Sequence, residues 1–417
     1  MRPSNRQRGS HASTRVAILT PMISRENGGA ASLLDLAQGF SSLGADVSLI
    51  ATSDSPTRFM VSRNRSGILK GYDRRGLHRI RLRRIDGPPR VGGIRALQGH
   101  ASPKRLAMWL GDQAEATLLS PRARRALVRS DLIIDGTAGK AVGEFELLDI
   151  GRSKLALNHN FSGDALYKMS PAGTRDLPEA HRALVAKYGW LLFQSSDVAN
   201  EVRLLDAEPT SRYLVVQPSC SEGEILASKR MPSPYKHHFS VVVVGSIQRR
   251  KGQRDAIEAL AGCPDHVILH LVGPIIDSTY YHELLAEAAR LEVVDRVVVH
   301  GYRKDYARFL AHADILLQPS SAEGVSRVLR EAMCCGLPIV AYRIPGTSAT
   351  LTDGVDSRLV EPTDVHALTD ALCGLIEDPA YTREMGHSAR LTYERTYSWS
   401  QLLARLNGLL ESVARVS

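Results

Sequence analysis

The sequence predicts an α/β protein built from two doubly wound domains of similar size that face each other across a cleft. Apolar runs alternate with amphipathic stretches almost throughout, which is typical of βαβ units and a parallel sheet. The pattern stops and restarts around residues 227–238, where two prolines and several charges indicate a linker. With 417 residues, the chain is long enough for two or three domains of about 150 residues each.

The N-terminal domain is expected at residues 15–226, after a basic, polar tail at residues 1–14. A short apolar run at residues 16–19 predicts its first strand, and a glycine-bearing turn at 27–29 leads into a helix at 31–43. Further apolar runs predict strands at residues 47–51, 132–134, 155–157, 190–193 and 213–217.

The C-terminal domain is expected at residues 239–390. Strands are predicted at residues 240–244, 267–272, 297–300, 315–318 and 338–341, and helices at 253–260, 305–311 and 325–334. In the last segment, 391–417, apolar residues at helical spacing between 393 and 416 predict an amphipathic helix. Such a helix needs a surface on which to pack.

Composition excludes several protein classes. The chain is 43% hydrophobic and 23% charged, as in ordinary globular proteins, and its five cysteines form no C-x-x-C motif. No apolar run approaches the roughly 18–20 residues that span a bilayer. We expect no secretory signal, because no apolar core follows the basic first fourteen residues. The sequence therefore favours a cytoplasmic protein, one that is free to rest on a membrane surface.

Positive charge gathers in residues 58–129. The whole chain carries a net charge of +9, whereas this segment holds 18 basic and 4 acidic side chains. Residues 77–85 alternate apolar with basic side chains, which predicts a strand with one cationic face. The functional interpretation is an anionic membrane surface or a lipid-diphosphate acceptor, and the alternative is a solvated face. Nucleic acid is not expected, because aromatics are sparse and no binding motif accompanies the charge.

A first candidate site lies in residues 320–338. A strand is expected to end at Pro319, a loop carries Glu323, and Gly324 is expected to open a helix whose free N–H groups suit a phosphate or a sugar hydroxyl. Glu331 follows roughly 7–8 Å along that helix. Two carboxylates so placed could hold two parts of an extended ligand. The alternative is a helix-start acid together with an ordinary surface glutamate.

A second candidate site runs from Gly245 to Gly252, directly after a predicted strand. A tight glycine turn with cations before a helix is how a phosphate cradle is built at the edge of a parallel sheet. The segment is not a Walker A loop, and G-x-G-x-x-G occurs nowhere in the chain. The alternative is that its three adjacent cations are solvated.

Together these motifs resemble the retaining glycosyltransferases of family 4, which have the GT-B fold. The motifs are Gly-x-x-x-x-Arg-Lys-Gly, the Gly301-Tyr302 turn, Asp-Ile-Leu-Leu-Gln-Pro-Ser, and two glutamates followed by Glu-Ala-Met-x-x-Gly-x-Pro. The resemblance runs from about residue 15 to 400 and is strongest over 241–345. It implies two Rossmann-like domains, with the C-terminal helix packing back on the N-terminal domain.

The resemblance also implies roles on the phosphate and ribose side of a nucleotide-sugar. Glu331 would bind the ribose hydroxyls, and Glu323 would lie against the donor sugar. Arg250 and Lys251 would bind the diphosphate. The backbone of the phosphate-binding loops would join them, at Gly245, Gly324, Val325 and Ser326.

Other positions carry weaker matches. Tyr302 and Arg303 stand where the family places the nucleobase. Gly28 and Gly29 would let the first loop approach the donor closely, because glycine has φ freedom that other residues lack. His159 matches a donor-sugar histidine, although a hydrogen-bonded structural histidine is the alternative.

The implied function is transfer of a sugar, with retention of configuration, from a UDP- or GDP-linked donor to a glycan, glycolipid or small glycoside. No cofactor or metal is expected, since no Asp-x-Asp motif is present. Two departures from the family are Ser246 in the phosphate loop and Pro218-Ser219-Cys220 after a strand. The alternatives are another GT-B enzyme (an epimerase or an inverting transferase) or a degenerate GT-B protein that binds anions.

Overall fold

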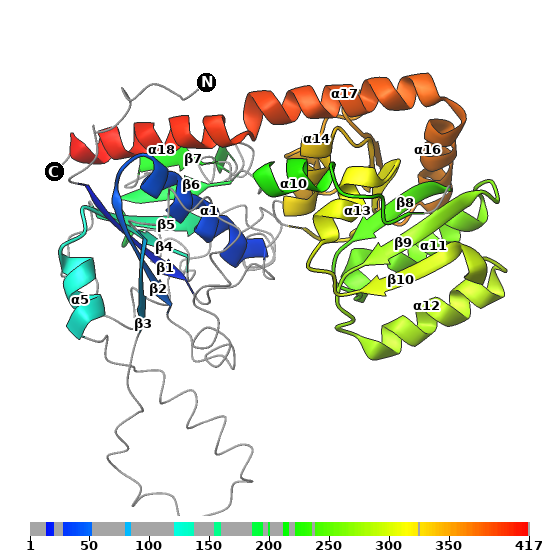
Figure 1. Cartoon of the computed structure of the whole chain (residues 1–417), viewed down its shortest axis with the longest axis horizontal. Coiled ribbons are helices and arrows are strands. Elements are labelled where there is room, and N and C mark those ends of the chain that lie inside the picture. The colour runs from blue at the N-terminus through cyan, green and yellow to red at the C-terminus, as the bar shows by residue number, and fades with distance from the viewer. Residues whose placement is uncertain are drawn as a thin grey trace, which may run out of the picture.

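The computed structural model describes residues 14–20, 28–51, 80–84, 121–136, 154–159, 186–194, 199–200, 212–216, 222–235, 238–323 and 326–415. Two α/β domains lie side by side, each built on a parallel sheet (Figure 1). Two long helices, α17 (Pro379–Thr396) and α18 (Trp399–Ala414), run along one side of both domains. The predicted fold class, two doubly wound α/β domains, is confirmed.

The N-terminal sheet has seven strands in the order β3-β2-β1-β4-β5-β6-β7, and all pairs are parallel. The strands are β1 (Arg15–Thr20), β2 (Asp46–Ala51), β3 (Ile80–Arg84), β4 (Leu132–Asp135), β5 (Leu155–His159), β6 (Trp190–Phe193) and β7 (Arg212–Val215). Strand β1 lies inside the sheet. The chain first adds β2 and β3 on one side of β1 and then adds β4 to β7 on its other side.

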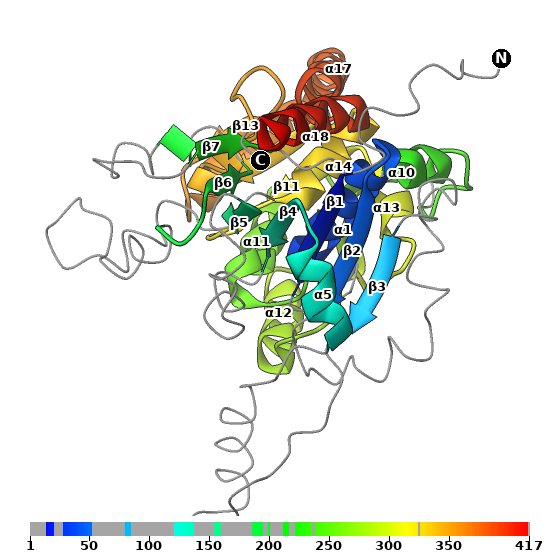
Figure 2. The same cartoon turned by 90° about the vertical axis from the view of Figure 1, so that its left-hand side faces the viewer.

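Helices cover this sheet because its strands are apolar on both faces. Helix α1 (Gly28–Ser42) follows β1 and buries Leu36 and Phe40 against Val16 and Ile18. Helix α5 (Pro121–Val128) precedes β4 and contacts the edge strand β3, as the turned view shows (Figure 2). The prediction of a strand within residues 77–85 is therefore confirmed, and that strand belongs to the sheet.

The C-terminal sheet has six parallel strands in the order β10-β9-β8-β11-β12-β13. The strands are β8 (Phe239–Val244), β9 (Val267–Val272), β10 (Val297–Gly301), β11 (Ile315–Gln318), β12 (Ile339–Tyr342) and β13 (Arg358–Val360). The helices are α10 (Glu222–Ser228), α11 (Gln253–Ala261), α12 (Ser278–Arg290), α13 (Tyr306–His312), α14 (Arg327–Cys335), α15 (Pro345–Ser348) and α16 (Val365–Glu377); η5 (Arg249–Lys251) and η6 (Val294–Arg296) are single 3₁₀ turns.

The run of valines in β8 shows why both faces of this sheet are covered. Val241 and Val243 point into one cluster with Ile257 of α11. Val242 points into the opposite cluster with Met333 of α14. Because successive side chains of a strand face opposite sides, an uninterrupted apolar run requires a helix layer on each face.

The last two helices join the domains. Helix α17 packs on α14 in the C-terminal domain, and α18 packs on α1 in the N-terminal domain. Leu402, Leu406 and Leu409 of α18 are fully buried, and a Cβ at Gly39 of α1 would lie 2.4 Å from Leu406 Cδ1. The expectation that the C-terminal helix packs back on the N-terminal domain is confirmed.

Three details differ from the sequence-based prediction. The amphipathic stretch from 393 to 416 is not one helix, because the chain leaves helical geometry at Tyr397 and Ser398 between α17 and α18. The helix expected at 325–334 begins at Arg327, since Ser326 has an extended ψ of 120° and precedes the first turn. Helices α5, α10, α12, α15 and α16 and strand β13 were not predicted. Among the described helices, none is long and apolar enough to cross a bilayer.

Candidate active site

Two loops meet where β8 and β11 end. The strands are neighbours and parallel, so the loops that follow them leave the same edge of the sheet. Gly252, at the start of α11, has φ +65°, and a Cβ there would lie only 1.9 Å from the carbonyl oxygen of Pro319. Only glycine combines a left-handed conformation with so close a backbone approach. This contact fixes the β8–α11 loop against the β11–α14 loop.

Glu323 of the second loop pairs with both cations of the first. Lys251 Nζ donates to Oε1 of Glu323, and Arg250 Nη1 lies 3.6 Å from Oε2. Arg250 Nη1 also donates to the carbonyl of Ala322 at 3.1 Å. The Lys251 side chain is 14% exposed and that of Arg250 is 48% exposed, so one cation is enclosed and the other faces solvent.

Gly245 makes room for the enclosed cation. A Cβ at this position would lie 3.3 Å from Lys251 Cε and 3.5 Å from Nζ. The lysine side chain therefore passes directly over the glycine at the end of β8. Three of the predicted site residues, Gly245, Lys251 and Glu323, thus form one continuous group.

Glu331 lies in a separate, buried group. Its Oε1 accepts a hydrogen bond from Tyr306 Oη at 2.7 Å and another from Arg327 Nε at 2.8 Å. Arg327 Nη1 reaches across to the other domain and donates to Asp35 Oδ2 at 2.6 Å. The carboxylate of Glu331 is 1% exposed. Glu331 lies on the predicted helix, four residues after its first residue Arg327, and it is buried, so it is not an ordinary surface glutamate; its partners were not predicted.

Burial and charge act against each other in this group. Burial raises the pKa of Glu331, and the neighbouring Arg327 opposes that rise. Burial lowers the pKa of Arg327, but Asp35 and Glu331 more than reverse this and raise it well above its ordinary value. Burial, followed by the charge of Glu331, raises the pKa of Tyr306. Arg327 therefore stays a cation, and it is the first of the groups that favour an ionised Glu331, together with Tyr306 and Arg330.

Ser326 stands at the N-cap position of the helix that carries both Arg327 and Glu331, and its side chain makes no capping hydrogen bond to the helix. Its hydroxyl lies 3.2 Å from Gln318 Nε2, at the end of β11, which ties the helix start to the sheet. The N–H groups of the first turn of α14 have no partner within the helix, as at any helix start. Gly324 and Val325, two of the predicted donor-binding residues, lie outside the described residues.

The residues predicted to meet the nucleobase follow β10. Tyr302 is 47% exposed and stands just after Gly301, which has φ +63°. Arg303 is held by Asp305 through two hydrogen bonds of 2.9 and 3.0 Å, and its guanidinium lies 5.4 Å from the ring centroid of Phe309. Both positions are at the same sheet edge as Lys251, because β10 is parallel to β9 and β8.

The N-terminal domain contributes backbone positions. His159 is the last residue of β5, opposite Phe193 in the register, and nothing is described of its side chain. Gly28 and Gly29 open α1, the helix that carries Asp35. These placements at carboxyl ends of strands agree with the general position of ligand sites in open parallel sheets. Their predicted roles stay predictions.

Sequence reasoning missed Arg327, Tyr306 and Asp35. Arg327 could have been found, because Arg and Glu four residues apart on a helix are neighbours. Tyr306 and Asp35 carried no such signal. Tyr306 reaches the site through the packing of α13 on α14, and Asp35 reaches it through a side-chain contact between the two domains, neither of which the chain pattern specifies.

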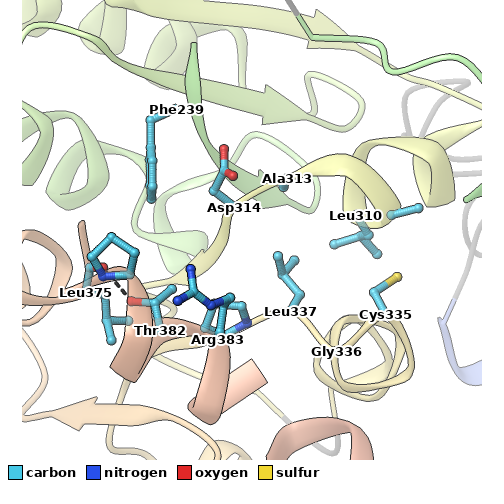
Figure 3. A pocket seen from close by; sticks show the side chains of 13 residues that line it. Phe239, Leu310, Ala313, Asp314, Cys335, Gly336, Leu337, Leu375, Thr382 and Arg383 are labelled. Carbon is cyan, nitrogen blue, oxygen red and sulfur yellow. Dashed lines mark hydrogen bonds between the residues drawn. The ribbon is translucent and has the colours of Figure 1, made fainter. Parts of the chain in front are cut away.

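A cavity of about 360 Å³ lies at the opposite edge of the C-terminal sheet (Figure 3). It is lined by the residues that begin β8, β11 and β12 and by the α16–α17 corner, among them Phe239, Asp314, Leu337, Leu375 and Arg383. Asp314 accepts a hydrogen bond from the Ser240 N–H at 2.7 Å, and burial raises its pKa. Since Glu323 and Lys251 lie where the strands end, this cavity is separate from their site.

The architecture matches known structures over nearly its whole length. The crystal structure of Anabaena HepE in complex with UDP superposes with a TM-score of 0.67 at 18% identity, covering 96% of this chain and 100% of that one. The chain has the GT-B fold. In this chain the fold consists of two parallel sheets, of seven and six strands, and a terminal helix that crosses back to the N-terminal domain.

Sequence comparisons add to the fold. Residues 238–378 match the model of the family described as glycosyl transferases group 1. D-inositol 3-phosphate glycosyltransferase of Xylanimonas cellulosilytica is 31% identical over 169 residues, 40% of each chain. GDP-mannose-dependent alpha-(1-6)-phosphatidylinositol monomannoside mannosyltransferase of Mycolicibacterium smegmatis is 27% identical, over 73% of this chain and 75% of that one. The chain thus matches the first of these relatives over less than half of that relative's length. In the matched parts, this GT-B chain is similar to glycosyltransferases.

Proposed function

We propose that this GT-B protein is a retaining glycosyltransferase that moves a sugar from a nucleoside-diphosphate sugar to a glycan, glycolipid or small glycoside. The observation that carries the proposal is the convergence of Arg250, Lys251 and Glu323 from two neighbouring loops, with Glu331 one helical turn beyond. The similarity of residues 238–378 to group 1 glycosyl transferases supports it. So does the likeness to a fold neighbour solved with UDP.

In this proposal the two cations bind the diphosphate. When the sugar leaves, negative charge develops on the β-phosphate, and cations already in place stabilise that charge without moving. Lys251 is enclosed, which suits it to the leaving oxygen of the β-phosphate. Arg250 is half exposed, which suits it to the other phosphate of the donor. Glu323, which pairs with both in this structure, would then turn toward the donor sugar.

Glu331 would bind the ribose. Its Oε1 is taken by Tyr306 and Arg327, which leaves Oε2 as the acceptor for a hydroxyl. Tyr302 and Arg303, exposed at the end of β10, would meet the base. Whether that base is uracil, as in the solved neighbour, or guanine, as in the mannosyltransferase relative, is left to the experiment.

Retention of configuration and independence of metal are part of the proposal. The cations can supply the charge that a metal supplies elsewhere, and the chain has no Asp-x-Asp motif. We favour attack on the front face of the sugar, with a phosphate oxygen accepting the proton of the acceptor hydroxyl. His159 and the glycines at the start of α1 would line the sugar from the opposite domain. Domain closure would exclude water and limit hydrolysis.

The acceptor side would be the N-terminal domain, with an anionic membrane surface as a partner. The basic strand β3 and helix α5 lie together at one edge of its sheet (Figure 2). On α5 and just after it, Arg125 and Arg129 are exposed beside Val128, which is 55% exposed. Cations around an apolar side chain suit a phospholipid surface. Sedimentation with anionic and with neutral vesicles tests this, and equal recovery with both would contradict it.

The decisive test is calorimetric binding of UDP and of GDP, with EDTA present, to wild type and Glu331→Ala. Binding of one nucleotide, weakened roughly 10- to 100-fold by the substitution, supports the proposal, since hydrogen bonds to a charged group contribute about 1.5–3 kcal/mol. No binding of either would refute it and favour a degenerate, anion-binding protein. Proton NMR of the product then separates retention from inversion, and epimerisation of the nucleotide-sugar alone would indicate an epimerase.

A further inference from the structure

Arg327 joins acids from the two domains. Its Nη1 lies 2.6 Å from Asp35 Oδ2 on α1, and its Nε lies 2.8 Å from Glu331 Oε1 on its own helix. The side chains of Arg327, Asp35 and Glu331 are 13%, 4% and 1% exposed. This is a buried group of three charges in which one cation is shared by two carboxylates. Such a group is specific in geometry, because each charge needs its partners to offset desolvation.

The two oxygens of Glu331 are not equivalent. Oε1 accepts from both Arg327 and Tyr306, whereas Oε2 is buried without a hydrogen-bond partner in the described part of the chain. A buried acceptor without a partner costs about 1–3 kcal/mol. An incoming hydroxyl donor would recover that energy. The arrangement therefore presents one oxygen of a fixed carboxylate for a ligand.

Asp35 holds the other side of the guanidinium. Nε and Nη1 of an arginine point in different directions, so one group can serve two carboxylates at once. Here Nε donates to Glu331 and Nη1 donates to Asp35. The acid on α1 thus fixes the direction in which Arg327 presents Nε to Glu331.

We propose that Arg327 is a positioning residue which, while held by Asp35, fixes Glu331 and keeps its Oε2 available to the donor ribose. The inference rests on the proposed function, because it assigns the ribose to Glu331. Its consequence is a link between domain arrangement and donor binding. Whenever α1 moves away from α14, Arg327 loses its contact with Asp35 and Glu331 loses part of the support that fixes its carboxylate, which weakens the donor site.

The first experiment compares nucleotide affinity in two matched variants. Asp35→Asn removes the charge that holds Nη1. Asp353→Asn removes the charge from another ion pair, in which Asp353 Oδ2 lies 2.6 Å from Arg343 Nη2 and both residues belong to the C-terminal domain. Calorimetry with UDP and GDP is expected to show a roughly tenfold weaker Kd for Asp35→Asn and no change for Asp353→Asn. Equal effects in both variants would overturn the proposal.

A double-mutant cycle separates positioning from general damage. If Asp35 acts through Arg327 on Glu331, then Asp35→Asn should weaken binding in wild type but have little further effect in a Glu331→Gln background. Purely additive effects would overturn the link. Thermal unfolding of each variant, with nucleotide absent, shows whether the fold is retained, and the cycle is read from the variants that retain it.

The pH profile supplies a readout that a structural role would not move. Arg327→Met removes the cation that most favours ionised Glu331, while Tyr306 and Arg330, which also favour it, stay in place. As the pH is lowered, nucleotide binding should therefore begin to weaken at a higher pH than in wild type. Arg327→Lys should restore most of the wild-type profile. Identical profiles for all three would overturn the proposal. Loss of binding in wild type itself would instead reject the proposed function, while wild-type binding that depends on Glu331 but not on Asp35 would reject only this inference.

Discussion

Substitution of Gly252 by alanine is expected to separate the two loops that form the candidate site. An alanine at φ +65° costs about 1–2 kcal/mol for the left-handed conformation alone. Its Cβ would also lie 1.9 Å from the carbonyl oxygen and 2.8 Å from the carbonyl carbon of Pro319, so the backbones must part by more than 1 Å to reach ordinary contact. Overpacking of this kind costs a further 1–3 kcal/mol or so. We expect Gly252→Ala to lower the free energy of unfolding by about 2–5 kcal/mol.

Gly354 provides the matched control. Its φ is +73°, yet a Cβ there would meet nothing within 4 Å. Gly354→Ala should therefore show the conformational cost alone, about 1–2 kcal/mol. Urea unfolding followed by circular dichroism measures both variants. The difference between them isolates the contact between the loops that carry Lys251 and Glu323.

The same pair of variants tests whether the contact serves the site. If the loops part, Lys251 and Glu323 no longer meet, and nucleotide binding should weaken by about tenfold in Gly252→Ala while Gly354→Ala binds like wild type. Equal losses of stability in the two variants would refute the steric argument. A large loss of stability in Gly252→Ala with wild-type affinity would refute the functional one.

The remaining predictions concern charge. Lys251→Ala should lower kcat by about 10² in a sugar-transfer assay, because an enclosed cation no longer faces the leaving diphosphate; unchanged turnover would remove its catalytic role. Burial, with His300 and His238 nearby, lowers the pKa of His270 from 6.5 to about 4. As the pH falls, His270 therefore takes up a proton in the unfolded chain at a higher pH than in the folded chain. Its contribution to the free energy of unfolding, about 3 kcal/mol at most, is complete above pH 6.5 and is lost as the pH falls toward 4. Urea unfolding of His270→Gln should show a shallower loss of stability over that range, whereas the exposed control His366→Gln should follow wild type; parallel curves for all three would contradict it.

The fold could be predicted from the sequence because its signal is local. A parallel strand that is buried on both faces has a short, uninterrupted run of apolar residues in the sequence. Each of the strands expected in both domains is present. Helices α12 and α16 were missed although each has a local signal, an aspartate directly before the helix (Asp277 and Asp364) whose side chain accepts a hydrogen bond from the first turn. The break at Tyr397 and Ser398 was missed for a different reason. It places α17 and α18 on different domains, and only the tertiary arrangement requires it.

The candidate site divides in the same way. Gly252, Lys251 and Glu323 were predictable, because a strand, a turn and a helix in a parallel sheet place those loops at one edge. The partner of Arg327 was not, since Asp35 is 292 residues away and belongs to the other domain. A single sequence contains no signal for a contact that depends on how two domains are packed together.

The two groups of charges favour one orientation of the proposed donor. Arg250, Lys251 and Glu323 together leave one positive charge at the loops. A diphosphate is attracted to that charge, while neutral ribose hydroxyls can donate to the Glu331 oxygen that has no partner in the described part of the chain. Reversing the donor would put phosphate against Glu331 and leave Lys251 with only Glu323. Charge therefore selects the orientation in which the leaving phosphate meets the enclosed cation, and in the proposal above the domain contact at Asp35 supports the carboxylate at the ribose end of that site.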